Sequence, residues 1–131
     1  MASIFSKIVA GEIPCYKVAE TEDCLAFLDV SPIVYGHVLV IPKKEVDYIF
    51  DLDDELFVKL HLFSKKVAKA LKKVVPCVKI GVAVVGVDVP HAHIHLAPIN
   101  NGSELAFDKE RVNLTPEEFK ELAAKIAAQM D

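Results

Sequence analysis

The spacing of hydrophobic and polar residues predicts one short helix and three strands in the N-terminal part of the chain. Hydrophobic residues recur at helical spacing over residues 4–9, and Gly11 follows as a stop. Extended hydrophobic runs then cover residues 16–19, 25–28 and 37–41, with polar or Pro/Gly-containing segments between them. These runs are typical of an antiparallel meander.

Two further helices are predicted. Over Glu55–Val75 hydrophobic residues recur at steps of three and four, and Pro76 ends the pattern. The lysines of this helix could form a phosphate-binding patch, but a solvated face is the favoured interpretation in an acidic protein. Near the C-terminus, Thr115-Pro-Glu-Glu supplies an N-cap hydroxyl, a proline at the first helical position and a glutamate at the third.

Two strands are predicted between these helices. Ile80–Val85 is a continuous β-branched run, Gly86–Pro90 reads as a turn, and His91–Leu96 alternates between histidine and apolar residues. We therefore expect an α+β fold: an antiparallel sheet of about five strands, one long helix packed on it and a C-terminal helix at the periphery.

Length and composition predict a single domain over residues 1–131. Of these residues, 53% are hydrophobic and 26% are charged, which suits a globular core. The sequence has no internal repeat, low-complexity stretch or linker. We expect residues 1–99 to form the core region and residues 100–131 a C-terminal extension that carries the last helix.

Charge and cysteine usage narrow the function classes. A net charge of −4 argues against broad binding to nucleic acid or to an anionic membrane surface, but not against a local pocket for a small anion. No signal-peptide pattern and no bilayer-spanning hydrophobic run is present, so a cytoplasmic location is expected. Cys15, Cys24 and Cys77 lack C-x-x-C spacing and are interpreted as reduced, buried thiols.

Three alternating histidines, His91, His93 and His95, are the candidate chemical groups. On a strand they would project from one face, while the residues between them face the core. Neighbouring imidazoles disfavour one another's protonation, so at least one should be neutral near pH 7. A neutral imidazole is a nucleophile and also a metal ligand. A metal enzyme is the less favoured interpretation, because no cysteine pair or carboxylate pattern accompanies the histidines.

The segment from His91 to Ala97 matches the H-φ-H-φ-H-φ-φ signature of the histidine triad (HIT) superfamily, in which φ is a hydrophobic residue. The chain resembles the nucleotide-binding hydrolases of the Hint/Fhit type in that superfamily. Further matching motifs occur in the same order over about the first hundred residues. They are Ile4-Phe5-x-Lys7-Ile8-x-x-Gly11-Glu12-Ile13-Pro14, Leu25-Ala26-Phe27-x-Asp29 and Gly36-His37-x-Leu39-Val40-Ile41-Pro42-Lys43.

The resemblance implies a role for each matching site residue. His93 would attack the α-phosphorus of a nucleotide and form a nucleotidyl-imidazole intermediate, which water or another acceptor resolves. His95 and His37 would hydrogen-bond phosphate oxygens or arrange proton transfer, and His91 would support the geometry. Asp29 would contact the ribose hydroxyls. Apolar residues would surround the base, although ordinary core packing is an equally weighted interpretation of them; they are Ile4, Phe5, Ile8, Phe27 and Val30.

The chain departs from its relatives at two places. The asparagine and glutamine that touch phosphate in many relatives have no clear counterpart in Ala83–Pro90. In that segment Asp88 stands near the leaving-group position, where an anionic carboxylate would disfavour anionic leaving groups and favour an amine. Some relatives hold a structural zinc at places that here carry Ser3, Ser6 and Glu45, so we expect no structural zinc and no cofactor.

The resemblance as a whole implies a phosphoramidase-like hydrolase or transferase. We expect it to act at the α-phosphate of nucleoside 5′-phosphoramidates or related conjugates, with purine nucleotides preferred. Relatives commonly pair through the long helix and an edge strand, so a homodimer is expected. A non-catalytic nucleotide-binding adaptor with the same fold is the alternative, followed by the metal enzyme. Residues 100–113 offer only a polar character, and their role stays open.

Overall fold

A computed structural model describes residues 2–130, and in this range the chain forms three α-helices, one 3₁₀ helix and five strands. Their order is α1 (Ile4–Val9), β1 (Lys17–Glu20), β2 (Cys24–Leu28), β3 (Val38–Pro42), η1 (Ile49–Asp51), α2 (Asp54–Val74), β4 (Lys79–Ala83), β5 (Ile94–Ile99) and α3 (Pro116–Ala128). The predicted elements are all present, and the boundaries of the long helix differ from the prediction by one residue at each end.

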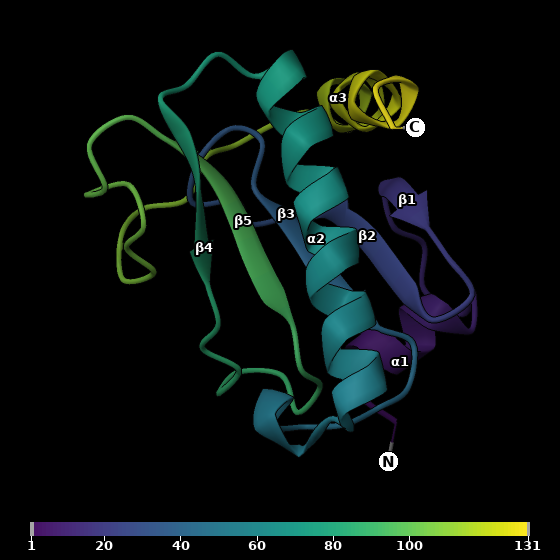
Figure 1. Cartoon of the computed structure of the whole chain (residues 1–131). Coiled ribbons are helices and arrows are strands. Elements are labelled where there is room, and N and C mark those ends of the chain that lie inside the picture. The colour runs from purple at the N-terminus through teal and green to yellow at the C-terminus, as the bar shows by residue number, and fades with distance from the viewer. Residues whose placement is uncertain (1, 131) are drawn as a thin grey trace.

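The five strands form one antiparallel sheet in the order β1-β2-β3-β5-β4 (Figure 1). The predicted α+β fold is therefore confirmed. β5 inserts between β3 and β4, and its register places His95 opposite Leu39 on one side and Ala83 on the other. His95 thus lies in the interior of the sheet, whereas β4 is an edge strand.

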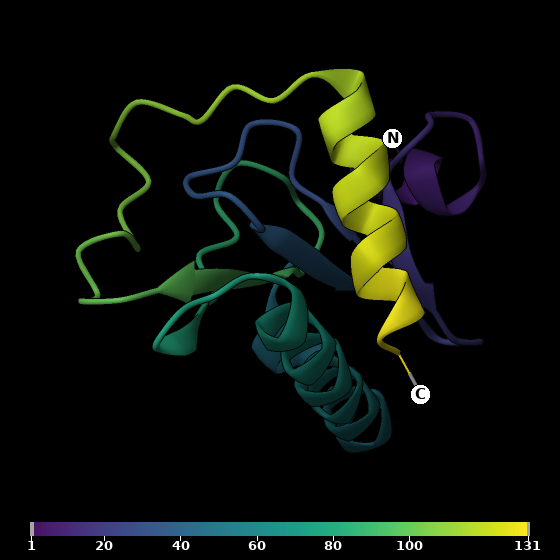
Figure 2. The ribbon, with the colours of Figure 1, turned by 90° about the horizontal axis from the view of Figure 1, so that it is seen from above.

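The two faces of the sheet carry separate hydrophobic clusters. Alternation along β3 sends Val38 and Val40 into the larger cluster, which α2 and α3 cover, and sends Leu39 and Ile41 into a smaller cluster beneath α1. Seen from above, α2 lies on the opposite side of the sheet from α1 (Figure 2). The smaller cluster matters most for function, since the histidines lie on its side of the sheet.

The C-terminal helix is part of the main core, so the prediction that it is peripheral was wrong. The predicted capping box is present: the Thr115 side chain accepts from the Glu118 amide, and the Glu118 side chain accepts from the Thr115 amide. Phe119, Leu122 and Ile126 are buried in the larger cluster, and the Phe119 ring stacks on Tyr16 with 4.9 Å between ring centroids. The apolar face of α3 needs this contact with β1 and α2 to leave water.

The alternating pattern predicted that all three triad histidines lie on a strand, but only His95 does. β5 begins at Ile94, so His91 and His93 precede it in irregular backbone. The ladder stops there because the Ala92 amide donates to the carbonyl of Val46, outside the sheet, at 2.7 Å. The predicted alternation of faces nevertheless continues through this segment: Ala92 and Ile94 join the larger cluster, whereas His91 and His93 pack against Phe5 of the smaller cluster.

Two further expectations concern membrane-spanning segments and the cysteines. Within residues 2–130, no helix is both long enough and apolar enough to cross a membrane. All three cysteines are free thiols, and Cys24 is buried as predicted. Cys15 and Cys77 are only partly buried, so the prediction was wrong for them. Cys15 lies at the edge of a pocket, and Cys77 lies in the turn between α2 and β4.

Candidate functional site

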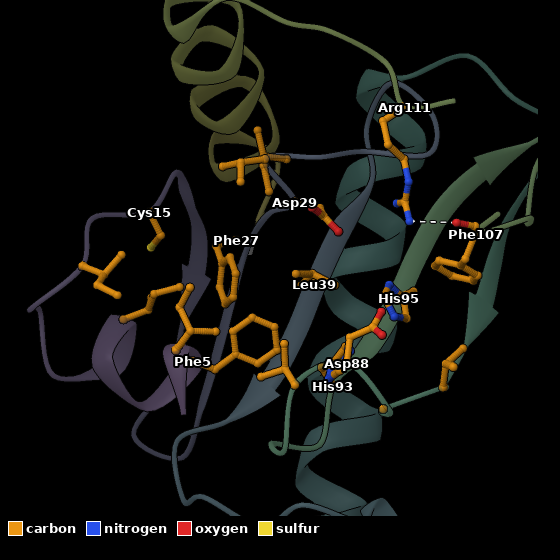
Figure 3. Close-up of a pocket in the computed structure, with 18 of the residues that line it drawn as sticks. Phe5, Cys15, Phe27, Asp29, Leu39, Asp88, His93, His95, Phe107 and Arg111 are labelled. Atoms are coloured by element: carbon orange, nitrogen blue, oxygen red, sulfur yellow. Dashed lines mark hydrogen bonds between the residues drawn. The ribbon is translucent and has the colours of Figure 1, made fainter. Parts of the chain in front are cut away.

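A pocket of about 320 Å³ opens on the α1 side of the sheet (Figure 3). Apolar side chains, including Phe5 and Phe27, line one end. Phe107 and Arg111 line the other end, and His93 and His95 lie between the two ends. The Phe5 ring packs edge-on against both Phe27 and His93, with 5.6 and 5.0 Å between ring centroids. One wall is therefore suited to a flat apolar group, and imidazoles lie beside it.

The structure brings together every residue that the sequence assigned to substrate binding. These pocket-lining residues are Ile4, Phe5, Ile8, Phe27, Asp29, Val30 and Asp88. Of the predicted catalytic histidines, His93 and His95 line the pocket, whereas His37 and His91 lie behind them and are fully buried. His37 does not line the pocket itself; it contacts two residues that do, His95 through a hydrogen bond and Asp29 at 3.6 Å between Nδ1 and Oδ2.

The backbone determines which nitrogen of His93 carries a proton. His93 Nδ1 lies 2.7 Å from the carbonyl oxygen of His91, and a carbonyl can only accept, so Nδ1 must donate. In a neutral imidazole the lone pair is then on Nε2. This nitrogen has no hydrogen-bond partner within residues 2–130. A nucleophilic nitrogen is thus available to a ligand in the pocket.

A chain of two hydrogen bonds gives His95 the opposite tautomer. The backbone amide of Ile33 donates to His37 Nδ1 at 3.1 Å, so neutral His37 carries its proton on Nε2. His37 Nε2 lies 2.9 Å from His95 Nδ1 and donates to it. Neutral His95 therefore carries its proton on Nε2. The site pairs a lone-pair nitrogen on His93 with an N–H donor on His95.

Burial keeps the two linked histidines uncharged. Desolvation, with smaller contributions from the charges of Arg111 and His93, lowers the pKa of His37 to about 4. Desolvation, His37, His93 and Arg111 lower the pKa of His95 to about 3. Both rings are thus neutral at pH 7, as the tautomer assignment requires.

His91 is fixed from both sides of its ring. Its Nε2 donates to the carbonyl of Pro42 at 2.7 Å, and its Nδ1 accepts from the hydroxyl of Ser3 at 2.9 Å. Ser3 is also the N-cap of α1, because its Oγ accepts from the Ser6 amide. The first triad histidine therefore connects α1 to β3. It also fixes the carbonyl that orients His93.

Ser3, Ser6 and Glu45 form one hydrogen-bonded cluster beside His91. Glu45 Oε1 accepts from the Ser3 amide and from the Ser6 hydroxyl, each at 2.6 Å. These hydrogen bonds lower the pKa of Glu45 to about 2. At the places where some relatives hold zinc, this chain has a carboxylate that accepts hydrogen bonds from two serines.

One group of described residues has the geometry to hold a metal ion, and it is not the triad. Potential ligand atoms of Asp29, His37 and His95 lie within 4.8 Å of one another, although the two histidines are hydrogen-bonded to each other. Both ring nitrogens of His91 are engaged by Ser3 and Pro42. The three triad histidines therefore do not form a joint ligand set, which disfavours the metal interpretation based on them.

Among the pocket residues that sequence reasoning missed are Phe107 and Arg111, which form the end of the pocket beside His95. The Phe107 ring lies against His95 with 4.6 Å between centroids, and the Arg111 guanidinium donates to the carbonyls of Ser31 and Phe107 at 3.0 Å each (Figure 3). The segment 100–113, whose role was left open, thus forms one end of the pocket. The sequence held one signal: Arg111 is the only arginine among its 131 residues.

Comparisons with known proteins agree with this fold and site. The HIT domain family model matches residues 10–102. An uncharacterized HIT-like protein of Borreliella burgdorferi is 35% identical, covering 95% of each chain. The adenosine 5′-monophosphoramidase hnt1 of Schizosaccharomyces pombe is 36% identical, covering 99% of each chain. A crystal structure of a HIT-like protein from Bartonella henselae has a TM-score of 0.86 at 33% identity, covering 98% of this chain and 96% of that one.

The fold and the buried His37–His95 pair define the class of protein, and the comparisons with known proteins identify the family. The chain belongs to the HIT family. The resemblance inferred from the triad motif is thereby confirmed.

The neutral histidines predict a loss of stability as pH falls. In the unfolded chain His37 and His95 have a pKa near 6.5, so below that pH the unfolded chain binds protons that the native protein does not. Above pH 6.5 neither state is protonated at these rings, and below it the free energy of unfolding falls until pH reaches about 4 for His37 and about 3 for His95. Each histidine contributes a slope of at most about 1.4 kcal/mol per pH unit. Urea unfolding between pH 7 and 5 measures this slope.

The His37→Asn variant tests the origin of the slope. Asparagine can still accept from the Ile33 amide but does not titrate, so we expect a shallower pH dependence. The matched control is His61→Asn, which replaces an exposed histidine on α2 and should leave the dependence unchanged. Equal slopes for the native protein and His37→Asn would contradict the assignment.

Proposed function

We propose that this protein hydrolyses nucleoside 5′-phosphoramidates, or related conjugates, at the α-phosphate through a nucleotidyl intermediate on His93. The observation that carries the proposal is the set of hydrogen bonds to His93, His37 and His95, from which we infer a lone pair on His93 Nε2 and an N–H on His95 Nε2. A nucleophile next to an oriented hydrogen-bond donor is the arrangement that a phosphoryl transfer through a covalent intermediate needs.

The pocket lining suggests how a nucleotide is held. The apolar end, with Phe5 and Phe27, suits a purine ring, and the carboxylate of Asp29 suits the ribose hydroxyls. Asp29 is oriented by the Ser31 amide, which donates to its Oδ1 at 2.8 Å. This placement directs the α-phosphate to His93 and His95.

Each histidine then has a distinct part in the reaction. His93 Nε2 forms a bond to phosphorus as the phosphorus–nitrogen bond breaks, and the leaving amine takes up a proton from solvent water. The carbonyl of His91 accepts from His93 Nδ1 and stabilises the positive charge that develops on the ring. His95 Nε2–H donates to a phosphate oxygen. Water then displaces the imidazole and releases the nucleoside monophosphate.

Asp88 supports an amine as the leaving group. Its carboxylate lines the same pocket as His93 and His95 and raises the pKa of His95, against the larger effect of burial. An anion leaving past this carboxylate is repelled, whereas a protonated amine is attracted. The S. pombe relative at 36% identity carries the name of a monophosphoramidase, which agrees with this preference.

The central experiment is single-turnover release of AMP from adenosine 5′-phosphoramidate in excess EDTA. We expect His93→Ala to slow release by about 10³-fold or more, because the nucleophile is removed. The control is Lys120→Ala, at an exposed residue of α3 away from the pocket and from β4, which should keep the native rate. We expect slower release from a dinucleoside polyphosphate than from the phosphoramidate.

Three outcomes would contradict the proposal. Loss of native activity on chelation would favour a metal enzyme. An unchanged rate for His93→Ala would exclude the covalent intermediate. AMP binding without release by the native protein would favour the non-catalytic adaptor.

We also propose that the protein acts as a homodimer. β4 ends the described sheet and exposes Val82, and the neighbouring Val84 and Val87 line an apolar hollow with Tyr48 and Phe50. An edge strand beside exposed apolar side chains fits an isologous contact with a second copy.

Light scattering tests the dimer. We expect twice the 14.4 kDa chain mass for the native protein, and one chain mass for Val82→Lys, which adds a charge at the edge strand. Lys120→Glu on α3 serves as the control and should keep the dimer. A monomeric native protein at micromolar concentration would refute the proposal.

A further inference from the structure

The charges around the pocket do not suit an anionic ligand unless Arg111 contributes. Asp29 and Asp88 both line the pocket, and a phosphate placed among them would be repelled. His95 is uncharged, as derived above. Arg111 is the one side chain with a permanent positive charge among the described residues that line the pocket.

Hydrogen bonds fix the Arg111 guanidinium beside the loop that carries Asp29. One terminal nitrogen donates to the carbonyl of Ser31, and the amide of Ser31 donates to Asp29 Oδ1. The other terminal nitrogen donates to the carbonyl of Phe107. A guanidinium has five N–H donors, so three have no partner in the described part of the chain.

Phe107 relates the guanidinium to the catalytic histidines. Its ring packs against His95, and the Arg111 Cζ lies 5.9 Å from the centroid of the same ring. Figure 3 shows Arg111 and Phe107 on the His95 side of the pocket, away from Phe5 and Phe27. The cation is therefore held where the phosphate, rather than the base, is expected.

We propose that Arg111 binds the anionic oxygens of the nucleotide phosphate, offsetting the carboxylates of Asp29 and Asp88. The proposal rests on the proposed function, since it takes the ligand to be a nucleotide. A guanidinium that is already fixed by two carbonyls presents its free donors with little further loss of side-chain entropy. Its planar fork matches two oxygens of one phosphate.

Calorimetric titration with AMP and with adenosine tests the proposal, because the two ligands differ only in the phosphate. For Arg111→Gln we expect AMP affinity to fall by about tenfold or more, while adenosine affinity stays within about twofold. The matched control is Lys109→Gln. Lys109 is a cation two residues away that does not line the pocket, and its replacement should change neither affinity.

Arg111→Lys provides a second variant that keeps the charge and loses the fork. We expect an intermediate loss for AMP and none for adenosine. If Arg111→Gln does not fold, the titrations with Arg111→Lys still test the proposal.

The alternative role of Arg111 is to tether the segment 100–113 to Ser31, and the titrations separate it from anion binding. Equal loss of AMP and adenosine affinity in both variants would show the tether and overturn the proposal, as would unchanged AMP affinity. Native protein that binds AMP no more tightly than adenosine would instead remove the phosphate-recognition premise of the proposed function itself.

Discussion

A neutral imidazole carries one N–H, and in this protein the backbone decides which nitrogen has it. The carbonyl of His91 accepts a hydrogen bond from His93 Nδ1, and the amide of Ile33 donates a hydrogen bond to His37 Nδ1. Together with the hydrogen bond from His37 Nε2 to His95 Nδ1, these contacts place the lone pair of neutral His93 and the N–H of neutral His95 both on Nε2. The proposed chemistry depends on this division, because two identical side chains must play opposite roles.

The fold keeps these hydrogen bonds out of water. His37, His91 and His95 are buried, and among residues 2–130 no buried side-chain nitrogen or oxygen lacks a partner. The register of β5 against β3 brings His95 to His37, and the N-cap of α1 fixes His91 through Ser3. Helix α1 therefore does more than cover a hydrophobic cluster: its N-cap, Ser3, helps to position the carbonyl of His91 that orients His93.

Local patterns in the sequence were enough to predict most of the fold. Helix α2 begins after the N-cap Asp53, and α3 after Thr115, so capping and apolar periodicity set their bounds. The alternation of histidine and apolar residues predicted the correct face of the sheet for each triad histidine. It did not give the start of β5 at Ile94, because that depends on the contact of Ala92 with Val46, far away in the sequence.

The site residues also fall into two groups: those that local sequence patterns predict and those that they do not. The residues that match family motifs, such as Asp29 and Phe27, line the pocket, whereas Phe107 and Arg111 belong to an irregular polar segment with no period to read. Their place follows from long-range hydrogen bonds such as that from Arg111 to Ser31, which composition does not indicate. The burial of α3 was missed for a related reason: its apolar face is visible in the sequence, but its partner is not.

The tautomers can be measured directly by nitrogen-15 NMR of the histidine rings at pH 7. For the neutral rings we expect the proton on Nδ1 and a bare Nε2 in His93, and the reverse in His95, with one proton on each ring of the His37–His95 pair. The same tautomer for His93 and His95, or a doubly protonated His95, would contradict this assignment.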